Sequence, residues 1–344
     1  MQFSQRESLI LKKLEKGEFS ISEILLFLEK SKLEVSKITL NRDLKHLEKL
    51  NLVKKLGKAK ATKYKLTTRY HIFKEVNFAE YFSVDFDDRK VIEDFNFEIY
   101  DALNDLFIEE EKSKFDDLNL EYRKKVSETS PGLLKKELER LMIELSWKSS
   151  RLEGNTYDLL DTEILIKEKL EAKNHTKEEA IMILSHKKAL DYAFGNKQSF
   201  LELSPRLIIK LHKFLVEGLE IKTGFREKKV GIIGTKYKPL AKGIEKAVSL
   251  LCDLVNSQTY PLSKALIVLA MMSYIQAFED GNKRTARILA TAILLAYDYC
   301  PISYRKVDDY DYKKAIILFY EQNNIVFLKK IFEAQFEFSV NEYF

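Results

Sequence analysis

Two arginines and an aspartate surround a glycine in the run Tyr274-Ile-Gln-Ala-Phe-Glu-Asp-Gly-Asn-Lys-Arg-Thr-Ala-Arg287. An apolar segment ends here and a second helical pattern begins after the glycine. Gly281 can adopt backbone angles closed to other residues, so successive N–H groups can converge on one anion, and the start of the next helix adds positive dipole. Arg284 and Arg287 lie three apart, where two guanidinium groups can bracket a polyphosphate. Asp280 is a hard oxygen ligand suited to Mg²⁺ shared with phosphate. The pattern predicts a nucleotide site.

This run resembles the signature of the Fic (Fido) family, His-Pro-Phe-x-Asp/Glu-Gly-Asn-Gly/Lys-Arg-x-x-Arg, whose members mostly transfer AMP from ATP to protein hydroxyl groups. The matching positions are Phe278, Asp280, Gly281, Asn282, Lys283, Arg284 and Arg287. The resemblance implies ATP and Mg²⁺ as cofactors and a protein target with a Ser, Thr or Tyr hydroxyl as partner. Gln276 and Ala277 depart from it, since they occupy the positions of the family's histidine and proline. That histidine is the general base, and the neutral amide of Gln276 cannot take a proton from a hydroxyl.

A second stretch, Ser149-Ser-Arg-Leu-Glu-Gly-Asn155, is similar to the inhibitory motif of the same family, in the upstream position of its class II members. By this resemblance Ser149, Glu153 and Gly154 are inhibitory, and Glu153 pairs with Arg287 and blocks the γ-phosphate of ATP. A helix over about 133–153 fits this role, because glycine readily terminates a helix and would hold the carboxylate at its tip. The alternative is an ordinary helix end with a solvated glutamate.

Residues 224–239 combine glycines with alternating β-branched residues, a pattern typical of a hairpin between helices. In Fic proteins the corresponding flap lies over the active site and holds the target segment by strand addition. The resemblance implies target-docking side chains at Val230, Ile232, Thr235 and Tyr237. A purely structural hairpin would show the same pattern.

Other nucleotide contacts follow from the same resemblance. Tyr312 and Tyr320 fall near family positions that hold the adenosine, with helix packing as the alternative role. Lys283 stands where the family has Gly or Lys, and its point charge at the helix start would attract phosphate.

The composition predicts a mainly helical protein. The chain has 344 residues, of which 45% are hydrophobic, with only 11 glycines and 5 prolines. The start carries no apolar signal segment, and the apolar run from Ala265 to Ile275 is too short to span a bilayer, so we expect a cytoplasmic protein without membrane contact. Cys252 and Cys300 lack metal-ligand spacing and are expected to be buried packing residues, as is His212.

The N-terminal segment predicts a winged helix-turn-helix. Helices are expected over 7–16, 21–29 and 36–50, followed by two short strands within 52–66. Residues 35–70 hold eleven lysines and arginines against two acids, whereas the whole chain has a net charge of +5, so the remainder is net negative. That asymmetry and a similarity to DeoR-type regulators over Val35–Val53 favour double-stranded DNA as partner, with protein contacts as the alternative. A homodimer reading two half-sites is expected.

The DNA-contacting side chains are expected on the third helix and on the loop between the strands. Ile38, Leu44 and Leu47 are predicted to face inward. The predicted DNA-binding residues are Lys37, Thr39, Asn41, Arg42, Lys45, Lys58 and Lys60.

The predicted fold is an all-helical Fic core with a β-hairpin flap, preceded by a small α+β winged-helix domain. The predicted domains are 1–70, a helical connector over 71–130, and a Fic domain over 131–344. Three functions remain open: an autoinhibited AMP transferase weakened by Gln276, a catalytically inactive nucleotide-responsive transcription regulator, and a module that grips a partner peptide.

Overall fold

Serine caps define the helices at the start of the chain in the computed structural model, which describes residues 3–343 except the side chain of Lys60. The elements are α1 (Gln5–Leu14), α2 (Ile21–Lys30), α3 (Lys37–Lys49), β1 (Val53–Leu56), η1 (Ala59–Ala61), β2 (Lys63–Leu66) and α4 (Thr68–Phe73). Ser4, Ser20 and Ser36 each accept a hydrogen bond from a backbone N–H of the first turn of α1, α2 and α3. The strands β1 and β2 pair antiparallel, with Val53 opposite Leu66.

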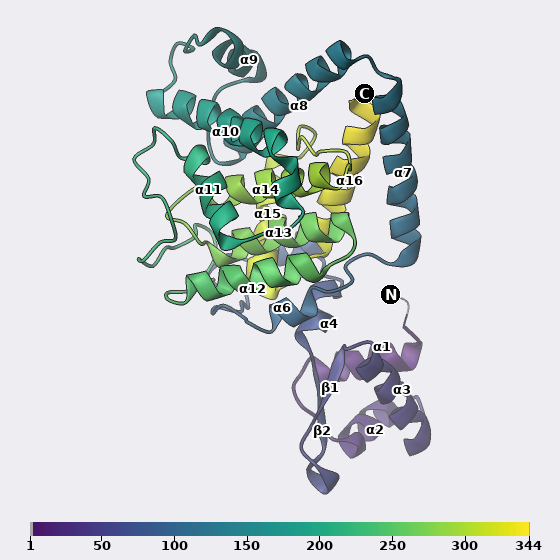
Figure 1. Ribbon diagram of the computed structural model, residues 1–344. Coiled ribbons are helices and arrows are strands. Elements are labelled where there is room, and N and C mark those ends of the chain that lie inside the picture. Colours follow the sequence, from purple (N-terminus) through teal and green to yellow (C-terminus); the bar gives the residue numbers. More distant parts are fainter. Residues whose placement is uncertain (1–2, 344) are drawn as a thin grey trace. The chain divides into compact units, whose positions relative to one another are not determined.

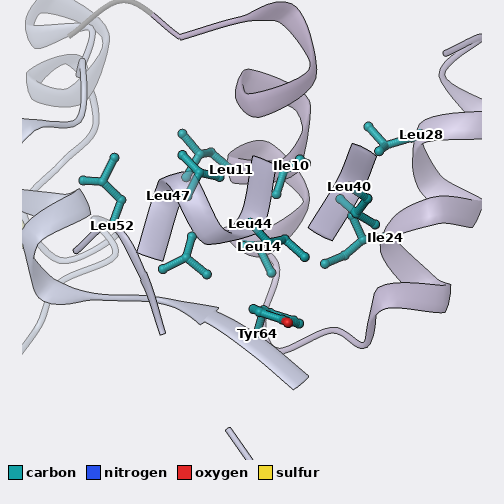
Figure 2. Close-up of a cluster of buried hydrophobic side chains, with 11 residues drawn as sticks. Ile10, Leu11, Leu14, Ile24, Leu28, Leu40, Leu44, Leu47, Leu52 and Tyr64 are labelled. Atoms are coloured by element: carbon teal, nitrogen blue, oxygen red, sulfur yellow. The ribbon is translucent and has the colours of Figure 1, made fainter. Parts of the chain in front are cut away.

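The apolar faces of these elements form one small core. Figure 2 shows side chains of α1, α2 and α3 pointing toward one another, with Tyr64 of β2 beside them. The buried members are Ile10, Leu11, Leu14, Ile24, Leu28, Leu40, Leu44, Leu47, Leu52, Val53 and Tyr64. This part of the chain is a compact unit that extends to Val76, since Tyr70 and Lys74 both pair with Glu15 of the first unit.

The second unit, from Asn77 onward, is built from helices. Its elements are α5 (Phe78–Ser83), α6 (Ile99–Ala102), α7 (Glu109–Glu128), α8 (Pro131–Leu152), α9 (Leu159–Glu168), α10 (Lys177–Gly195), η2 (Lys197–Phe200), α11 (Pro205–Leu215), α12 (Ile244–Ser257), α13 (Pro261–Ile275), α14 (Asn282–Ala296), α15 (Asp309–Gln322) and α16 (Val326–Glu342). The mainly helical prediction is therefore confirmed.

Helix α13 is the central element of the second unit. Every one of its residues is buried, and it packs against α12, α14, α15 and α16, with α12 and α14 beside it in Figure 1. A helix that is apolar all round is stable only when other helices enclose it. Both ends of α13 are therefore fixed, including the end that leads into the signature run.

Two predicted segments adopt other structures. Residues 91–98, expected to be helical, form a non-helical stretch that ends in a turn before α6. No strand is assigned among residues 224–239, so the predicted hairpin ladder is absent there, and the only bridge is a parallel one between Asp94 and Lys238. The glycines of this loop remove side chains that would stabilise a ladder, and polar groups near its two ends bond to other segments instead.

Within residues 3–343, no helix combines the length and apolar character that a membrane span requires.

Candidate functional site

A compact turn joins α13 to α14, and one asparagine side chain holds it. Asn282 accepts from the Phe278 N–H at 2.8 Å, and its amide nitrogen donates to the Phe278 carbonyl at 2.9 Å and to Gln276 Oε1 at 3.1 Å. Gln276 and Gly281 bound the turn with φ of 51° and 77°. The left-handed angle at Gly281 favours glycine at the N-cap of α14. The first N–H groups of α14 are thereby presented at the turn.

His212 of α11 supports the turn from behind. Its ring stacks on Phe278, with ring centres 3.6 Å apart and planes 2° apart, and its Nε2 donates to the Asp280 carbonyl at 3.0 Å. Burial lowers the pKa of His212 to about 4, so the ring is neutral at pH 7. The predicted buried role of His212 is confirmed, and the residue also braces the signature turn.

Arg284 and Arg287 are buried at the start of α14 with unused donors. Arg284 donates from Nη2 to Asp280 Oδ2 at 2.9 Å, while its Nε and Nη1 have no partner within residues 3–343. Arg287 donates from Nε to Ser149 Oγ and from Nη2 to the Ser149 carbonyl, both at 2.9 Å, and its Nη1 is likewise unpartnered in the described chain. Buried N–H groups without acceptors are costly, so these three donors fit an anionic ligand at this helix start.

Glu153 lies between two cations of α14. Its Oε1 is 2.8 Å from Arg287 Nη2 and its Oε2 is 2.6 Å from Lys283 Nζ, and the side chain is 16% exposed. Desolvation raises the pKa of Glu153, but the attraction of Arg287 and Lys283 outweighs it and lowers the pKa to about 2. The predicted contact between Glu153 and Arg287 is thus present, and the carboxylate is ionised at neutral pH.

The end of α8 is held so that this carboxylate points at α14. Glu153 is the C-cap of α8, and Gly154 follows it with φ of 102°, a value that favours glycine. Lys148 and Arg151 both pair with Asp309 at the start of α15, at 2.5 and 3.3 Å. The sequence analysis did not predict these two ion pairs, because nothing in the order of residues brings Asp309 near α8.

Gln276 is part of the turn itself. Its Nε2 donates to the Ser273 carbonyl at 2.7 Å and lies 3.4 Å from the Tyr320 hydroxyl, while its Oε1 accepts from Asn282. The side chain is only 9% exposed. Gln276, at the position predicted to be catalytic, therefore has its amide hydrogen-bonded to neighbouring residues. A neutral amide is not a base that can remove a proton from a hydroxyl.

The two predicted adenosine residues are both buried on α15. Tyr312 lies with its ring 5.7 Å from the Arg287 guanidinium carbon. Tyr320 lies under Gln276 and beside Tyr237, with ring centres 5.5 Å apart. Both side chains pack within the helical core in this conformation.

Asp280 is the predicted metal ligand. Its side chain is 63% exposed, and one oxygen accepts from Arg284 while the other faces no hydrogen-bond donor in the described chain. No group of three His, Cys, Asp or Glu side chains within residues 3–343 is placed to hold a metal ion. A single exposed carboxylate suits Mg²⁺ when phosphate oxygens and water complete the shell.

The flap, residues 224–239, is fastened by an arginine that sequence reasoning overlooked. Buried Arg226 donates to the carbonyl oxygens of Gln276, Lys228 and Leu240 at 2.6 to 2.7 Å, and its N–H donates to the Ala277 carbonyl at 3.0 Å. It therefore links both limbs of the flap to the signature turn. An arginine with only carbonyl partners has no sequence signal.

The four predicted docking residues of the flap are placed differently from one another. Val230 and Ile232 are half-buried. Thr235 and Tyr237 are buried, and the Tyr237 hydroxyl donates to the Tyr274 carbonyl at 2.9 Å. These two side chains are enclosed by the protein itself, and their role in docking a target stays a prediction.

On the N-terminal unit, α3 carries five of the seven predicted DNA-binding side chains and exposes three of them. Lys37, Arg42, Lys45 and Lys58 are exposed, Thr39 and Asn41 are half-buried, and the side chain of Lys60 lies outside the described residues. Leu44 and Leu47 face inward as predicted. The prediction for Ile38 is wrong: its side chain is 81% exposed, because it lies in the first turn of α3, and Leu40 fills the core in its place.

The two cysteines, Cys252 and Cys300, are free and buried as predicted. Burial raises the pKa of the Cys252 thiol to about 12, so it is an unreactive packing residue.

The fold and the site define a helical protein in which a turn with two buried arginines joins two core helices, and the loop of residues 224–239 is hydrogen-bonded to that turn. The model of the Fic/DOC family matches residues 202–294, so the chain contains a Fic/DOC domain. The match includes the signature turn and the flap. It does not reach Glu153 or the N-terminal unit.

Curated relatives share this domain. The protein adenylyltransferase Fic of Nematostella vectensis is 25% identical over 188 residues, which cover 52% of this chain and 43% of the relative. The protein of the same name in Aedes aegypti is 25% identical over 196 residues, covering 54% of this chain and 38% of the relative. The chain thus spans less than half the length of these relatives.

Solved structures support the fold. Fic-1 from C. elegans matches with a TM-score of 0.61 at 16% identity, covering 67% of this chain and 70% of that one. A Fic domain containing signaling protein from Bacteroides thetaiotaomicron matches with a TM-score of 0.55 at 21% identity, covering 66% and 94%. At these identities the likeness concerns the fold alone.

Proposed function

We propose that the second unit binds ATP at the start of α14 and that Glu153 restrains its use. The observation that carries this proposal is the position of Glu153, whose two oxygens are paired with Lys283 and Arg287. These are the cations that a terminal phosphate would pair with. A carboxylate held on them by the protein itself acts as a resident competitor of that phosphate.

The unpartnered donors of Arg284 and Arg287 support ATP as the ligand. The helix dipole and the free N–H groups of Gly281, Asn282 and Lys283 favour the same anion. Asp280 is the residue that would hold Mg²⁺ together with phosphate oxygens, and the ion would offset phosphate charge there. Tyr312 and Tyr320 are the candidates for the adenosine side, and they would have to shift from their present packing to contact it.

The family-implied reaction is AMP transfer from ATP to a Ser, Thr or Tyr hydroxyl of a protein. The hydroxyl oxygen bonds to the α-phosphorus, the bond to the β-phosphate oxygen breaks, pyrophosphate leaves, and the hydroxyl proton passes to a base. Gln276 cannot be that base. A positioned general base contributes about 10²–10⁴-fold to a rate, whereas charge stabilisation is usually the larger contribution. We therefore expect ATP binding to persist and transfer to be slow.

Incubation with Mg²⁺ and α-labelled ATP tests this proposal, scored for bound nucleotide and for covalent label. The chain is compared with Glu153→Gly and with Glu153→Gly plus Gln276→His. We expect tighter ATP binding in both variants and strong self-labelling only where histidine is restored. Labelling by Glu153→Gly alone would mean that the native chain has another base. Failure of all three proteins to bind ATP would overturn the proposal.

A second candidate function is regulation of transcription, favoured by the basic side chains that α3 exposes. Lys37, Arg42 and Lys45 are exposed on α3. In the predicted winged helix this helix would be the recognition helix that enters the major groove of double-stranded DNA. Lys58 at the turn between the strands would contact phosphate. In this proposal two copies read two half-sites, and ATP bound at α14 changes the affinity for DNA.

Fluorescence anisotropy with labelled duplex DNA, with and without ATP, tests this second function. Arg42→Ala and Lys45→Ala should each weaken binding and reduce the slope of log affinity against log salt by about 0.9. Lys30→Ala, at the end of α2, is the matched control. Absence of DNA binding with ATP binding retained would leave the nucleotide proposal intact. Absence of both would favour the peptide-gripping module.

A further inference from the structure

A segment ahead of the main helices, a turn at residues 85–89 followed by a non-helical stretch, lies along the flap. Residues 85–96, here called the strap, connect α5 to the start of α6. The Lys238 N–H donates to the Glu93 carbonyl at 2.6 Å, and Asp94 forms a parallel bridge with Lys238. The Lys238 ammonium also pairs with the Glu93 carboxylate at 2.6 Å. The C-terminal limb of the flap therefore has a backbone partner from a remote part of the chain.

Two further contacts join the strap to the flap at residues that precede Lys238. Arg89 donates from Nη2 to the Gly234 carbonyl at 2.7 Å, and Lys236 donates to the Asp87 carbonyl at 2.6 Å. The strap thus holds the flap at Gly234, Lys236 and Lys238. Alternate residues of one limb are fastened along a single edge.

The strap is itself anchored to α15. Arg89 is buried, and its Nη2 lies 3.4 Å from Glu321 Oε1, while the Tyr81 hydroxyl donates to Glu321 Oε2 at 2.7 Å. The Ile92 N–H donates to the Glu321 carbonyl at 2.8 Å. One guanidinium therefore ties the flap to the helix that also carries Tyr312 and Tyr320.

Between its two fastenings the flap is unpaired. Arg226 holds the first limb at Lys228, and the strap holds the second limb from Gly234. The backbone groups of residues 229–233 make no hydrogen bond within the described chain. Ile233 in this stretch is 98% exposed. Unpaired backbone beside fixed limbs is the arrangement on which an extended peptide can be added as a strand.

We propose that the strap holds the flap in register over the signature turn and that Arg89 is a positioning residue for the acceptor segment. This proposal rests on the proposed transfer function. Loss of the Arg89 contact to Gly234 would loosen the second limb at the end nearest residues 229–233, although Lys236 and Lys238 would still be held. The acceptor would then meet a mobile edge, and its hydroxyl would be placed less accurately against the nucleotide. Nucleotide binding at α14 would be unaffected.

Trypsin cleavage of the folded full-length chain after Lys228 and Lys229 tests the strap without any need for transfer. The variants are Arg89→Lys, which keeps a positive charge for Glu321 but loses the guanidinium Nη2 that donates to the Gly234 carbonyl, and Lys236→Ala. The control is Arg123→Lys, since Arg123 also donates to two carbonyls, those of Tyr297 and Asp298, away from the flap. Cleavage after exposed Lys173, between α9 and α10, is the internal reference.

We expect cleavage after Lys228 and Lys229 to become about tenfold faster in Arg89→Lys, the factor that one hydrogen bond from a charged donor represents. A smaller increase is expected in Lys236→Ala and none in the control. Equal acceleration after Lys173 would mean general destabilisation and would overturn the proposal. Unchanged cleavage in both strap variants would overturn it as well.

Self-labelling gives the functional readout. In the Glu153→Gly plus Gln276→His background, adding Arg89→Lys should lower the labelling rate several-fold at unchanged ATP affinity. A higher labelling rate would identify the strap as a competitor of the acceptor and contradict the positioning role. If the background itself does not label, the transfer function fails, and the trypsin result still decides whether the strap holds the flap.

Discussion

Under the proposed function, the start of α14 is the nucleotide side of the site and the flap is its acceptor side. The two sides are held by different forces. On the nucleotide side, Arg287 and Lys283 are buried or half-buried cations already paired with Glu153. On the acceptor side, Arg226 and Arg89 hold the flap by donating to neutral carbonyl oxygens. The backbone groups of residues 229–233 make no hydrogen bond within the described chain. Charge pairing fixes the first side, whereas ordinary hydrogen bonds and a free backbone edge characterise the second.

This difference indicates how each side meets its ligand. Under the proposed function, a phosphate would have to displace a carboxylate that is attracted to the same cations, so binding there would be a competition between two anions. A peptide at the flap would meet backbone groups of residues 229–233 that have no partner in the described chain. The proposal therefore assigns control over the nucleotide to the charge pairs and control over the acceptor to the rigidity of the flap.

Replacement of Arg287 by alanine should produce the largest effect. It leaves Glu153 paired with Lys283 alone, and removal of one partner of a buried pair costs about 3–5 kcal/mol. We expect loss of stability near the lower figure, because Glu153 keeps one cation, and loss of measurable ATP binding. Denaturant unfolding and calorimetric titration with ATP are the measurements.

Arg151→Ala is the control for that variant. Arg151 is an arginine of α8 itself, and it is half-exposed, pairs with Asp309 at 3.3 Å and lies 5.7 Å from the centre of the Trp147 ring. Its removal should cost less than about 1 kcal/mol. Similar losses in the two variants would show that Arg287 has no special place in the site.

Tyr237→Phe weakens the flap side by a single hydrogen bond. The hydroxyl donates to the Tyr274 carbonyl at 2.9 Å, and a neutral hydrogen bond contributes about 1 kcal/mol. We expect a stability loss of that size with unchanged ATP affinity, measured by the same two methods. Tyr310→Phe, on an exposed tyrosine of α15, should change neither quantity. A fall in ATP affinity in Tyr237→Phe would break the separation between the two sides.

Much of the nucleotide side could be predicted because its signal is local. The glycine, the asparagine and the arginines of one turn lie within twelve residues, so their types and spacing carry the geometry. The contact of Glu153 with Arg287 bridges a long stretch of sequence, and it was predicted only through a family resemblance. The helix end at Gly154 made it physically sensible, but no spacing rule links α8 to α14.

The contacts on the acceptor side were predicted less well because the residues that pair are far apart in the sequence and bond through ordinary backbone carbonyl groups. Arg226 and Arg89 bond to carbonyl oxygens, which every residue possesses, so nothing in the sequence marks the pairing. The hairpin over 224–239 was expected from local alternation, yet its second limb pairs with Glu93 and Asp94 instead. Ile38 was predicted to face inward from the spacing of apolar residues. That spacing does not reveal that no other element covers the first turn of α3.

The pH dependence should test the Glu153 ion pairs without any substitution in the flap, because Glu153 and His212 titrate in different pH ranges. The pKa of Glu153 is about 2, against a usual value of 4.5, so its stabilising pair is complete above pH 4.5 and is lost only as the pH falls toward 2. His212 acts in the same direction but at higher pH: its pKa of about 4 lies below the usual 6.5, so the unfolded chain binds the extra proton first and global stability falls as the pH drops from 6.5 to 4.

The effect of Glu153 on ATP affinity should therefore be constant between pH 5 and pH 8, although global stability declines in the lower part of that range. The measurement is the ratio of ATP affinities of Glu153→Gln and the native chain across this range. Taking the ratio cancels the titration of ATP itself and of His212, because both proteins share them. A ratio that shrinks toward one by pH 6 would mean that Glu153 takes up a proton there, so its pairing with Lys283 and Arg287 would be far weaker than the short distances require.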